Sequence, residues 1–253
     1  DMEPFQPVMI GKIEVLPILC RNTSYYDFAF LITTPDGTIH WTGDLFLHAL
    51  QAEKSIAQMK LLKEKNIDVL LCDATAFMDS VMEMIYGFTD VSLVKADLDV
   101  PVNMLSEQQH RDYILSIIAK CRGLCVFNYY AREMDDADFL IQCAADNGRS
   151  CVFEPEAAYI VHKFFHIEPY VYLPNAADDS TVNQPEWRSE LLNHCIVVTA
   201  EQIMANPSGY LLQSSYRRIL ELFSLPGKDG VYIHMGGAPV GEFDPAYQKM
   251  CKI

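Results

Sequence analysis

Two carboxylates stand directly behind runs of residues that predict β-strands. Asp44 ends the sequence Thr42-Gly43-Asp44 after the predicted strand Thr38–Thr42, and Asp73 follows the predicted strand Ile67–Cys72. A carboxylate at a strand end can bind a metal ion or a substrate, or transfer a proton, so the two could form an acid/base or metal constellation. The alternative interpretation is that both residues are solvated caps of their strands.

A glycine-rich loop follows the last predicted strand, Val231–Met235. Its sequence, Gly236-Gly237-Ala238-Pro239-Val240-Gly241, loosely imitates a phosphate-binding loop, whereas the chain has neither Gly-x-Gly-x-x-Gly nor Gly-Lys-Ser/Thr. A loop at the C-terminal edge of an open α/β sheet lies where such folds bind ligands. Gly236 and Gly237 are therefore candidate substrate-binding residues, and an ordinary tight turn is the alternative.

The first part of the chain predicts three strands in a row, then a helix and a further strand. The first three strands are Ile13–Leu19, Phe28–Thr34 and Thr38–Thr42. Pro35-Asp36-Gly37 predicts a tight turn between the last two. Ala52–Lys65 has the spacing of an amphipathic helix. The continuous apolar run at 67–72 is typical of a strand covered on both faces.

From residue 106 onward, predicted helices and strands alternate. The strands are expected at 124–129, 150–153, 170–173, 196–199 and 231–235, and the helices at 106–120, 134–146, 155–165 and 215–223. Strands separated by helices of this length run parallel and are joined by right-handed crossovers. The fold class is therefore α/β, with one domain over 1–105, including a crossover at 76–105, and an open, mainly parallel sheet flanked by helices over 106–253.

The charge of the chain limits its partners. The 253 residues include 19 Lys+Arg and 34 Asp+Glu, which gives a formal net charge of −15. Such a field disfavours binding of nucleic acid or of an anionic membrane by the whole surface, but it leaves room for a local basic groove. No apolar run reaches the ~18–20 residues that span a bilayer, and the first residues lack the order of a signal peptide, so we expect a cytoplasmic protein without membrane contact.

Three segments together resemble a known family. They are NTSYYDFAFLITTPDGTIHWTGD (Asn22 to Asp44), LCDAT (Leu71 to Thr75) and YIHMGGAPVGEFDPAY (Tyr232 to Tyr247). The first two are similar to the metallo-β-lactamase fold as it occurs in β-CASP hydrolases, the ribonuclease J and cleavage-factor group. The third is similar to a bacterial subgroup of uncharacterised metallo-hydrolases. The resemblance implies a partial metallo-β-lactamase β-layer followed by a β-CASP α/β domain.

The same resemblance implies a site for zinc or another divalent metal. Asp44 matches the metal-bridging aspartate, and Asp73 matches the acidic residue that supports the metal or the proton transfer. Asn22 stands where the family has a metal-binding histidine, and an amide oxygen is a poor ligand for zinc. The family's upstream histidine cluster and its C-terminal histidines have no counterpart. We therefore expect this chain, an internal portion or a degenerate relative, to bind no metal by itself and to be inactive alone.

Three functions are compatible with these features. The first is a metal-dependent phosphodiesterase that cleaves RNA through a metal-activated water. The second is a non-catalytic binding protein on the same fold, acting as a homodimer or with a partner protein. The third is an unrelated flavodoxin-like domain for a small ligand at 106–253.

The resemblance places the substrate in a cleft between the two parts. Tyr129 and Tyr130 would stack on the bases of single-stranded RNA there, and Arg132 would contact a phosphate. The alternative is that Arg132 caps its helix or pairs with Asp135 or Asp136.

Overall fold

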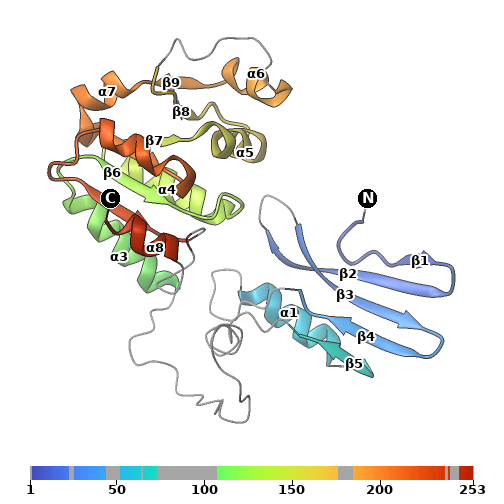
Figure 1. Ribbon diagram of the computed structural model, residues 1–253. Coiled ribbons are helices and arrows are strands. Elements are labelled where there is room, and N and C mark those ends of the chain that lie inside the picture. The colour runs from blue at the N-terminus through green and yellow to red at the C-terminus, as the bar shows by residue number, and fades with distance from the viewer. Residues whose placement is uncertain are drawn as a thin grey trace. The chain divides into compact units, whose positions relative to one another are not determined.

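The structure of the chain is a computed structural model that describes residues 2–22, 26–43, 52–63, 65–72, 107–175, 185–236, 239 and 245–252 (Figure 1). The chain divides into two compact units, Asp1–His110 and Arg111–Ile253. No helix among the described residues is long and apolar enough to cross a membrane.

The first unit contains a five-stranded sheet. Its strands are β1 (Val8–Ile10), β2 (Ile13–Asn22), β3 (Tyr26–Thr34), β4 (Gly37–Trp41) and β5 (Val69–Leu71), in the spatial order β1-β2-β3-β4-β5. The pairings from β1 to β4 are antiparallel, and β4 pairs with β5 in parallel. Helix α1 (Ala52–Leu62) connects these two parallel strands. The turn predicted at Pro35-Asp36-Gly37 is confirmed, because Thr34 pairs with Gly37 across it.

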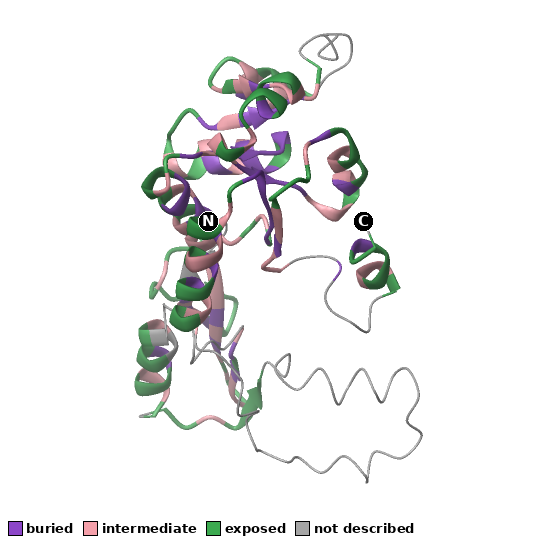
Figure 2. Ribbon diagram, turned by 90° about the vertical axis from the view of Figure 1, so that its left-hand side faces the viewer, coloured by how far each residue is buried: buried purple, intermediate pink, exposed green. Residues whose placement is uncertain are grey.

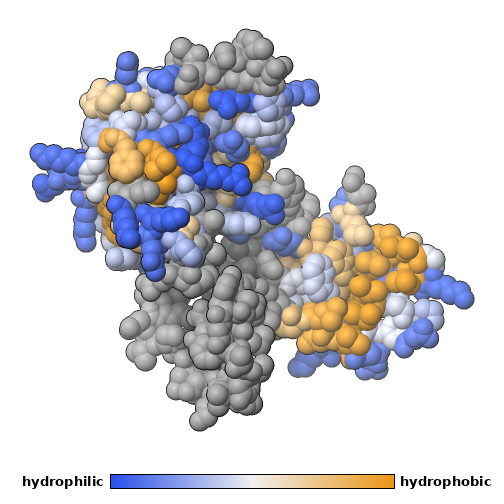
Figure 3. Space-filling view, viewed as in Figure 1, coloured by the Kyte–Doolittle hydropathy of each residue, from blue (hydrophilic) through white to orange (hydrophobic). Residues whose placement is uncertain are grey.

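The two faces of this sheet differ in what covers them. On one face Ile18, Ala29 and Leu31 form a buried cluster that packs against Leu61 and Leu62 at the end of α1. On the other face the register aligns Pro17, Phe30, Trp41 and Leu71 in a row across four strands. The rings of Phe30 and Trp41 stack there, with centroids 5.6 Å apart. Apolar side chains gather over this sheet in the view of Figure 3.

The expectation that the run 67–72 is a strand covered on both faces is wrong. Val69, Leu70 and Leu71 are 47%, 59% and 52% exposed, because β5 lies at the edge of the five-stranded sheet. A short apolar run does not distinguish an edge strand from a central one.

A buried polar network fastens α1 to the carboxyl end of β4. His40 Nδ1–H donates to the carbonyl oxygen of Phe30 at 3.1 Å, so Nε2 is left as an acceptor for the Gln58 side-chain amide, also at 3.1 Å. The same amide donates to the carbonyl oxygen of Thr42 at 3.1 Å. Burial lowers the pKa of His40, which keeps the imidazole neutral as this pattern requires.

Gly43 sets the direction of the chain immediately before Asp44. Its φ of +57° lies in the left-handed region, and a Cβ atom at this position would lie 2.8 Å from the carbonyl oxygen of Phe28. Glycine is the residue that fits both requirements without strain. The backbone that leads to Asp44 is thus fixed by β3 and by Gln58 of α1, whereas Asp44 itself lies outside the described residues.

The second unit contains a six-stranded sheet in the order β11-β6-β10-β7-β8-β9. Its strands are β6 (Cys125–Asn128), β7 (Ser150–Phe153), β8 (Tyr170–Tyr172), β9 (Ile196–Val198), β10 (Tyr210–Gln213) and β11 (Val231–His234). Every pairing within it is parallel. The unit is a parallel sheet flanked by helices, as the sequence predicts.

Helices cover both faces of this sheet. One face packs against α3 (Glu107–Lys120), α4 (Met134–Asp146), α5 (Pro155–Phe165) and α6 (Glu186–Leu192). The other packs against α7 (Ala200–Ala205) and the 3₁₀ helix η4 (Tyr216–Ser224), and the chain continues to α8 (Pro245–Met250). In Figure 2 the buried residues follow the strands, and the outer sides of the helices are exposed.

This division follows from the handedness of the connections. From β6 to β7, β8 and β9 the chain moves in one direction across the sheet, so right-handed crossovers place α4, α5 and α6 on one face. The chain then reverses to β10 and β11, which places α7 and η4 on the opposite face. Strand β10 is not among the predicted strands. It lies at the centre of the sheet and has only four residues, directly after the 3₁₀ turn η3 (Pro207–Gly209).

The network around Gln58 generates a first prediction. Gln58→Met keeps the length of the side chain but leaves His40 Nε2 without its buried donor and removes the stronger of two donors to the Thr42 carbonyl, which then keeps Cys20 Sγ at 3.4 Å. This loss costs about 1–3 kcal/mol. Urea unfolding followed by Trp41 fluorescence, in a Trp187→Phe background, measures the free energy of unfolding of the first unit. Lys60→Met is the matched control, because Lys60 is exposed on the same helix. Equal stabilities of the two variants would contradict the prediction.

Candidate functional site at the carboxyl edge of the parallel sheet

The reversal of the chain makes the connections on the two sides of β10 diverge. The strands β6 and β7 are followed by helices on one face, whereas β10 between them is followed by η4 on the other. Open α/β sheets bind ligands outside the carboxyl ends of strands where neighbouring connections diverge in this way. The carboxyl edge around β10 is therefore the candidate functional site.

Polar side chains converge at this edge although the surrounding strands are apolar. Asn128 ends β6, Gln213 and Ser214 end and follow β10, Glu154 follows β7, and His234 ends β11. The first four are buried, with 3–6% of each residue exposed. These five residues are called the carboxyl-edge site below.

Glu154 joins the ends of two neighbouring strands. Its backbone N–H donates to Gln213 Oε1 at 2.9 Å, and its own carboxylate oxygen Oε1 accepts from the backbone N–H of Ser215 at 2.6 Å. Burial raises the pKa of Glu154, while the hydrogen bonds from Ser215 and the charge of Arg218 oppose the rise. A buried carboxyl of this kind suits proton transfer, but its contacts show that it also holds the β10 end in place.

His234 holds the start of the glycine-rich loop. Its Nδ1 accepts from the side-chain amide of Asn128 at 3.3 Å, and its Nε2–H donates to the carbonyl oxygen of Pro239 at 2.8 Å. Gly236 follows at the end of β11, and a Cβ there would lie 4.0 Å from the backbone nitrogen of Tyr130. The structure thus brings Gly236 next to the segment after β6. Gly237 lies outside the described residues.

The two tyrosines after β6 have different surroundings. Tyr129 is 3% exposed, and its ring packs against Phe127 and Phe153 with centroids 5.7 and 6.3 Å away. Burial raises its pKa, and its hydroxyl has no hydrogen-bond partner among the described residues. Tyr130 is 50% exposed, so its ring, and not that of Tyr129, faces solvent at this edge.

Arg132 is exposed and lies two residues beyond Tyr130. Asp136, one of the two acids considered as its partner, forms an ion pair with Arg111 at 3.1 Å. The neighbouring strands β6 and β11 end at the same edge of the sheet. This part of the edge carries Tyr130 and Arg132, which follow β6, and Gly236, which follows β11.

The residues expected to hold a metal are not brought together in the described part of the chain. Asp44 and Asp73 lie outside the described residues. Asn22 ends β2, where its backbone pairs with Tyr26. The described residues contain no group of three or more His, Cys, Asp or Glu side chains that could hold a metal ion. The carboxyl-edge site, by contrast, was not predicted as a cluster, although Asn128, Glu154 and Gln213 each stand at the end of an apolar run.

The fold and this edge define the second unit as an open, parallel α/β domain. No protein-family model and no curated protein match the chain. Among solved structures, the chain is similar to a protein of unknown function from Enterococcus faecalis V583, with a TM-score of 0.67 and 20% sequence identity. The alignment covers 99% of this chain and 52% of that one, so the chain spans about half the length of its structural neighbour. At this identity the likeness shows the fold.

Glu154 predicts a dependence of stability on pH. Because its pKa is raised in the folded chain, its favourable contribution is present below its ordinary pKa of 4.5 and is lost as pH rises through the folded value. Glu154→Gln keeps an oxygen for the Ser215 N–H and does not ionise. The stability of the variant relative to the wild type should therefore increase between about pH 4.5 and 8.

Trp187 fluorescence in a Trp41→Phe background follows the unfolding of the second unit in urea at each pH. Glu201→Gln, an exposed position on the first turn of α7 whose charge does not act on Glu154, is the control and should leave the dependence on pH unchanged. A relative stability of Glu154→Gln that decreases as pH rises would show that the ionised carboxylate is the favoured form.

Proposed function

We propose that the chain is the RNA-binding part of a metal-dependent phosphodiesterase of the β-CASP metallo-β-lactamase type. The observation that carries the proposal is the carboxyl edge of the six-stranded sheet, where the exposed ring of Tyr130, the exposed Arg132 and Gly236 lie beside buried polar strand ends. Single strands bind proteins through stacking on aromatic rings and through cations that contact phosphates.

The described residues give each part of this edge a role. Tyr130 offers a half-exposed ring for stacking on a base, and Arg132 supplies a positive charge for a phosphate in a chain with a net charge of −15. Gly236 lets the backbone of a ligand approach closely because it has no side chain. The hydrogen bond of Glu154 holds Ser215 after β10, and that of His234 holds Pro239 after β11. Both bonds fix the backbone beside the residues proposed to contact RNA.

The chemical step of such a hydrolase requires a divalent metal to activate water, with Asp44 as a ligand and Asp73 in support by resemblance. The described residues include no group of three or more metal-binding side chains, and by the same resemblance Asn22, with a neutral amide, stands where the family has a histidine. We therefore derive no step through a metal. The second candidate function, a non-catalytic binding protein on this fold, is favoured by that replacement.

RNA binding at this edge is tested by two arginine variants. Fluorescence anisotropy of a labelled, short single-stranded RNA at low salt should give binding that weakens as salt is added. Arg132→Ala should raise the Kd and reduce the slope of log Kd against log salt by about one, which corresponds to one lost phosphate contact. Arg122→Ala should leave both unchanged, because Arg122 is exposed before β6, at the opposite end of that strand.

Equal effects of the two arginine variants would mean that RNA contacts the protein through general electrostatics. An absence of salt-dependent binding would refute the RNA proposal.

The metal content separates the two candidate functions for the chain itself. After dialysis against buffer with trace zinc or manganese, the purified chain should hold no stoichiometric metal, since one aspartate and an amide make a weak site. Elemental analysis per mole of protein is the measurement. One tightly held ion per chain would contradict this and would favour the hydrolytic function for the chain alone.

A further inference from the structure

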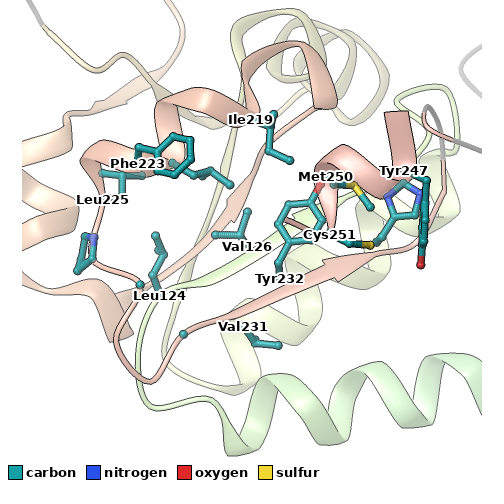
Figure 4. Close-up of a pocket in the computed structure, with 15 residues that line it drawn as sticks. Leu124, Val126, Ile219, Phe223, Leu225, Val231, Tyr232, Tyr247, Met250 and Cys251 are labelled. Carbon is teal, nitrogen blue, oxygen red and sulfur yellow. The ribbon is translucent and has the colours of Figure 1, made fainter. Parts of the chain in front are cut away.

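A pocket lies on the face of the six-stranded sheet that carries η4, apart from the carboxyl-edge contacts proposed for RNA. Its floor is formed by β6 and β11, with Val126 and Tyr232 at the centre, and its volume is about 610 Å³. In Figure 4, Phe223 lies toward one end, and Tyr247 of α8 toward the other. Pockets of a few hundred cubic ångströms, lined by apolar and aromatic side chains, are typical binding sites for small molecules.

The described residues that line the pocket are mainly apolar. Among the described residues that line it there is no Asp, Glu, Lys or Arg. His234 also lines it, but both ring nitrogens are engaged, one with Asn128 and one with the carbonyl oxygen of Pro239. A charged ligand would lose its hydration here without gaining an opposite charge, so the pocket favours a neutral one.

Tyr232, one of the residues that line the pocket, ends in a hydroxyl group. Its hydroxyl is buried and has no hydrogen-bond partner among the described residues. Burial raises the pKa of Tyr232 to about 12, so the hydroxyl keeps its proton and is both a donor and an acceptor. Buried hydroxyl groups in folded proteins are normally paired, and a polar group of a bound molecule would supply the missing partner.

We propose that this pocket binds a neutral, largely apolar small molecule that contains an aromatic ring and one group that hydrogen-bonds to the Tyr232 hydroxyl. The rings of Phe223, Tyr232 and Tyr247 supply surfaces for edge or face contacts with an aromatic ligand. Apart from His234, the other described lining residues are aliphatic, sulfur-containing, proline or glycine residues, such as Val126 and Met250, and offer apolar surface to the ligand. This binding site goes beyond the proposed RNA contacts and does not depend on them.

N-phenyl-1-naphthylamine, an uncharged aromatic amine whose fluorescence increases in apolar surroundings, is a suitable probe. A titration of the full chain should give saturable binding. Phe223→Ala should weaken it about fivefold or more, because an aromatic wall of the pocket is lost. Leu220→Ala is the matched control on η4: Leu220 is 66% and Phe223 70% exposed, but only Phe223 is among the lining residues. The control should change the Kd by less than about twofold.

Two further variants decide where and how the probe binds. Tyr232→Phe removes only the hydroxyl and should weaken binding about threefold or more if that group pairs with the ligand. Unchanged binding of this variant would overturn the polar contact. Trp41→Ala tests the exposed apolar face of the five-stranded sheet, and a signal lost there but kept in Phe223→Ala would overturn the pocket as the site.

A measurement on the wild type does not depend on how the variants fold. Cys251 lines the pocket and is exposed, whereas Cys72 is exposed in the other unit. Saturating probe should slow alkylation of Cys251 by iodoacetamide, measured by mass spectrometry of its peptide, and should leave Cys72 unaffected. Equal rates at Cys251 with and without probe, or an absence of saturable fluorescence, would refute the proposal.

Discussion

The handedness of parallel crossovers is the constraint on which the second unit depends. Each right-handed connection places its helix on the face set by the direction in which the chain crosses the sheet. The reversal of that direction after β9 therefore determines which face the last helices cover. It inserts β10 between β6 and β7 and moves η4 to the opposite face. The divergence of connections at the carboxyl edge around β10 and the position of η4 beside the pocket are both consequences of this single reversal.

Burial of polar groups at the strand ends is the second constraint. The ends of β6, β7 and β10 are buried, and His234 at the end of β11 is half-buried, so the polar side chains there need partners. Glu154 finds Gln213 and Ser215, and Asn128 finds His234. These bonds cross from one strand to the next, and they hold together segments that are distant in the sequence. The same contacts therefore stabilise the sheet and position the edge at which we propose that RNA binds.

In the first unit, buried hydrogen bonds likewise fix the segment that follows β4. A glutamine of α1 reaches the end of β4 through His40 and Thr42, and a left-handed glycine turns the chain against the Phe28 carbonyl. These contacts of the helix, the strand and the glycine together fix the backbone up to Gly43, the residue before Asp44. On the opposite, apolar face of the sheet, the aromatic rings of neighbouring strands stack on each other and are partly exposed. The two faces of the sheet therefore differ, because α1 covers only the first one.

The sequence by itself determined those helices, strands and turns that depend on residues close together in the chain. The Pro35-Asp36-Gly37 turn and the alternation after residue 106 predict the β3–β4 hairpin and a parallel α/β sheet, because turn residues and hydrophobic period act over a few neighbours. The tertiary structure alone decided that four residues at 210–213 form the central strand, that β5 is an exposed edge, and that Tyr129 is covered while Tyr130 is not. The grouping of Asn128, Glu154, Gln213 and His234 also needed the strand order, since pairing between residues far apart in the chain leaves no local pattern to read.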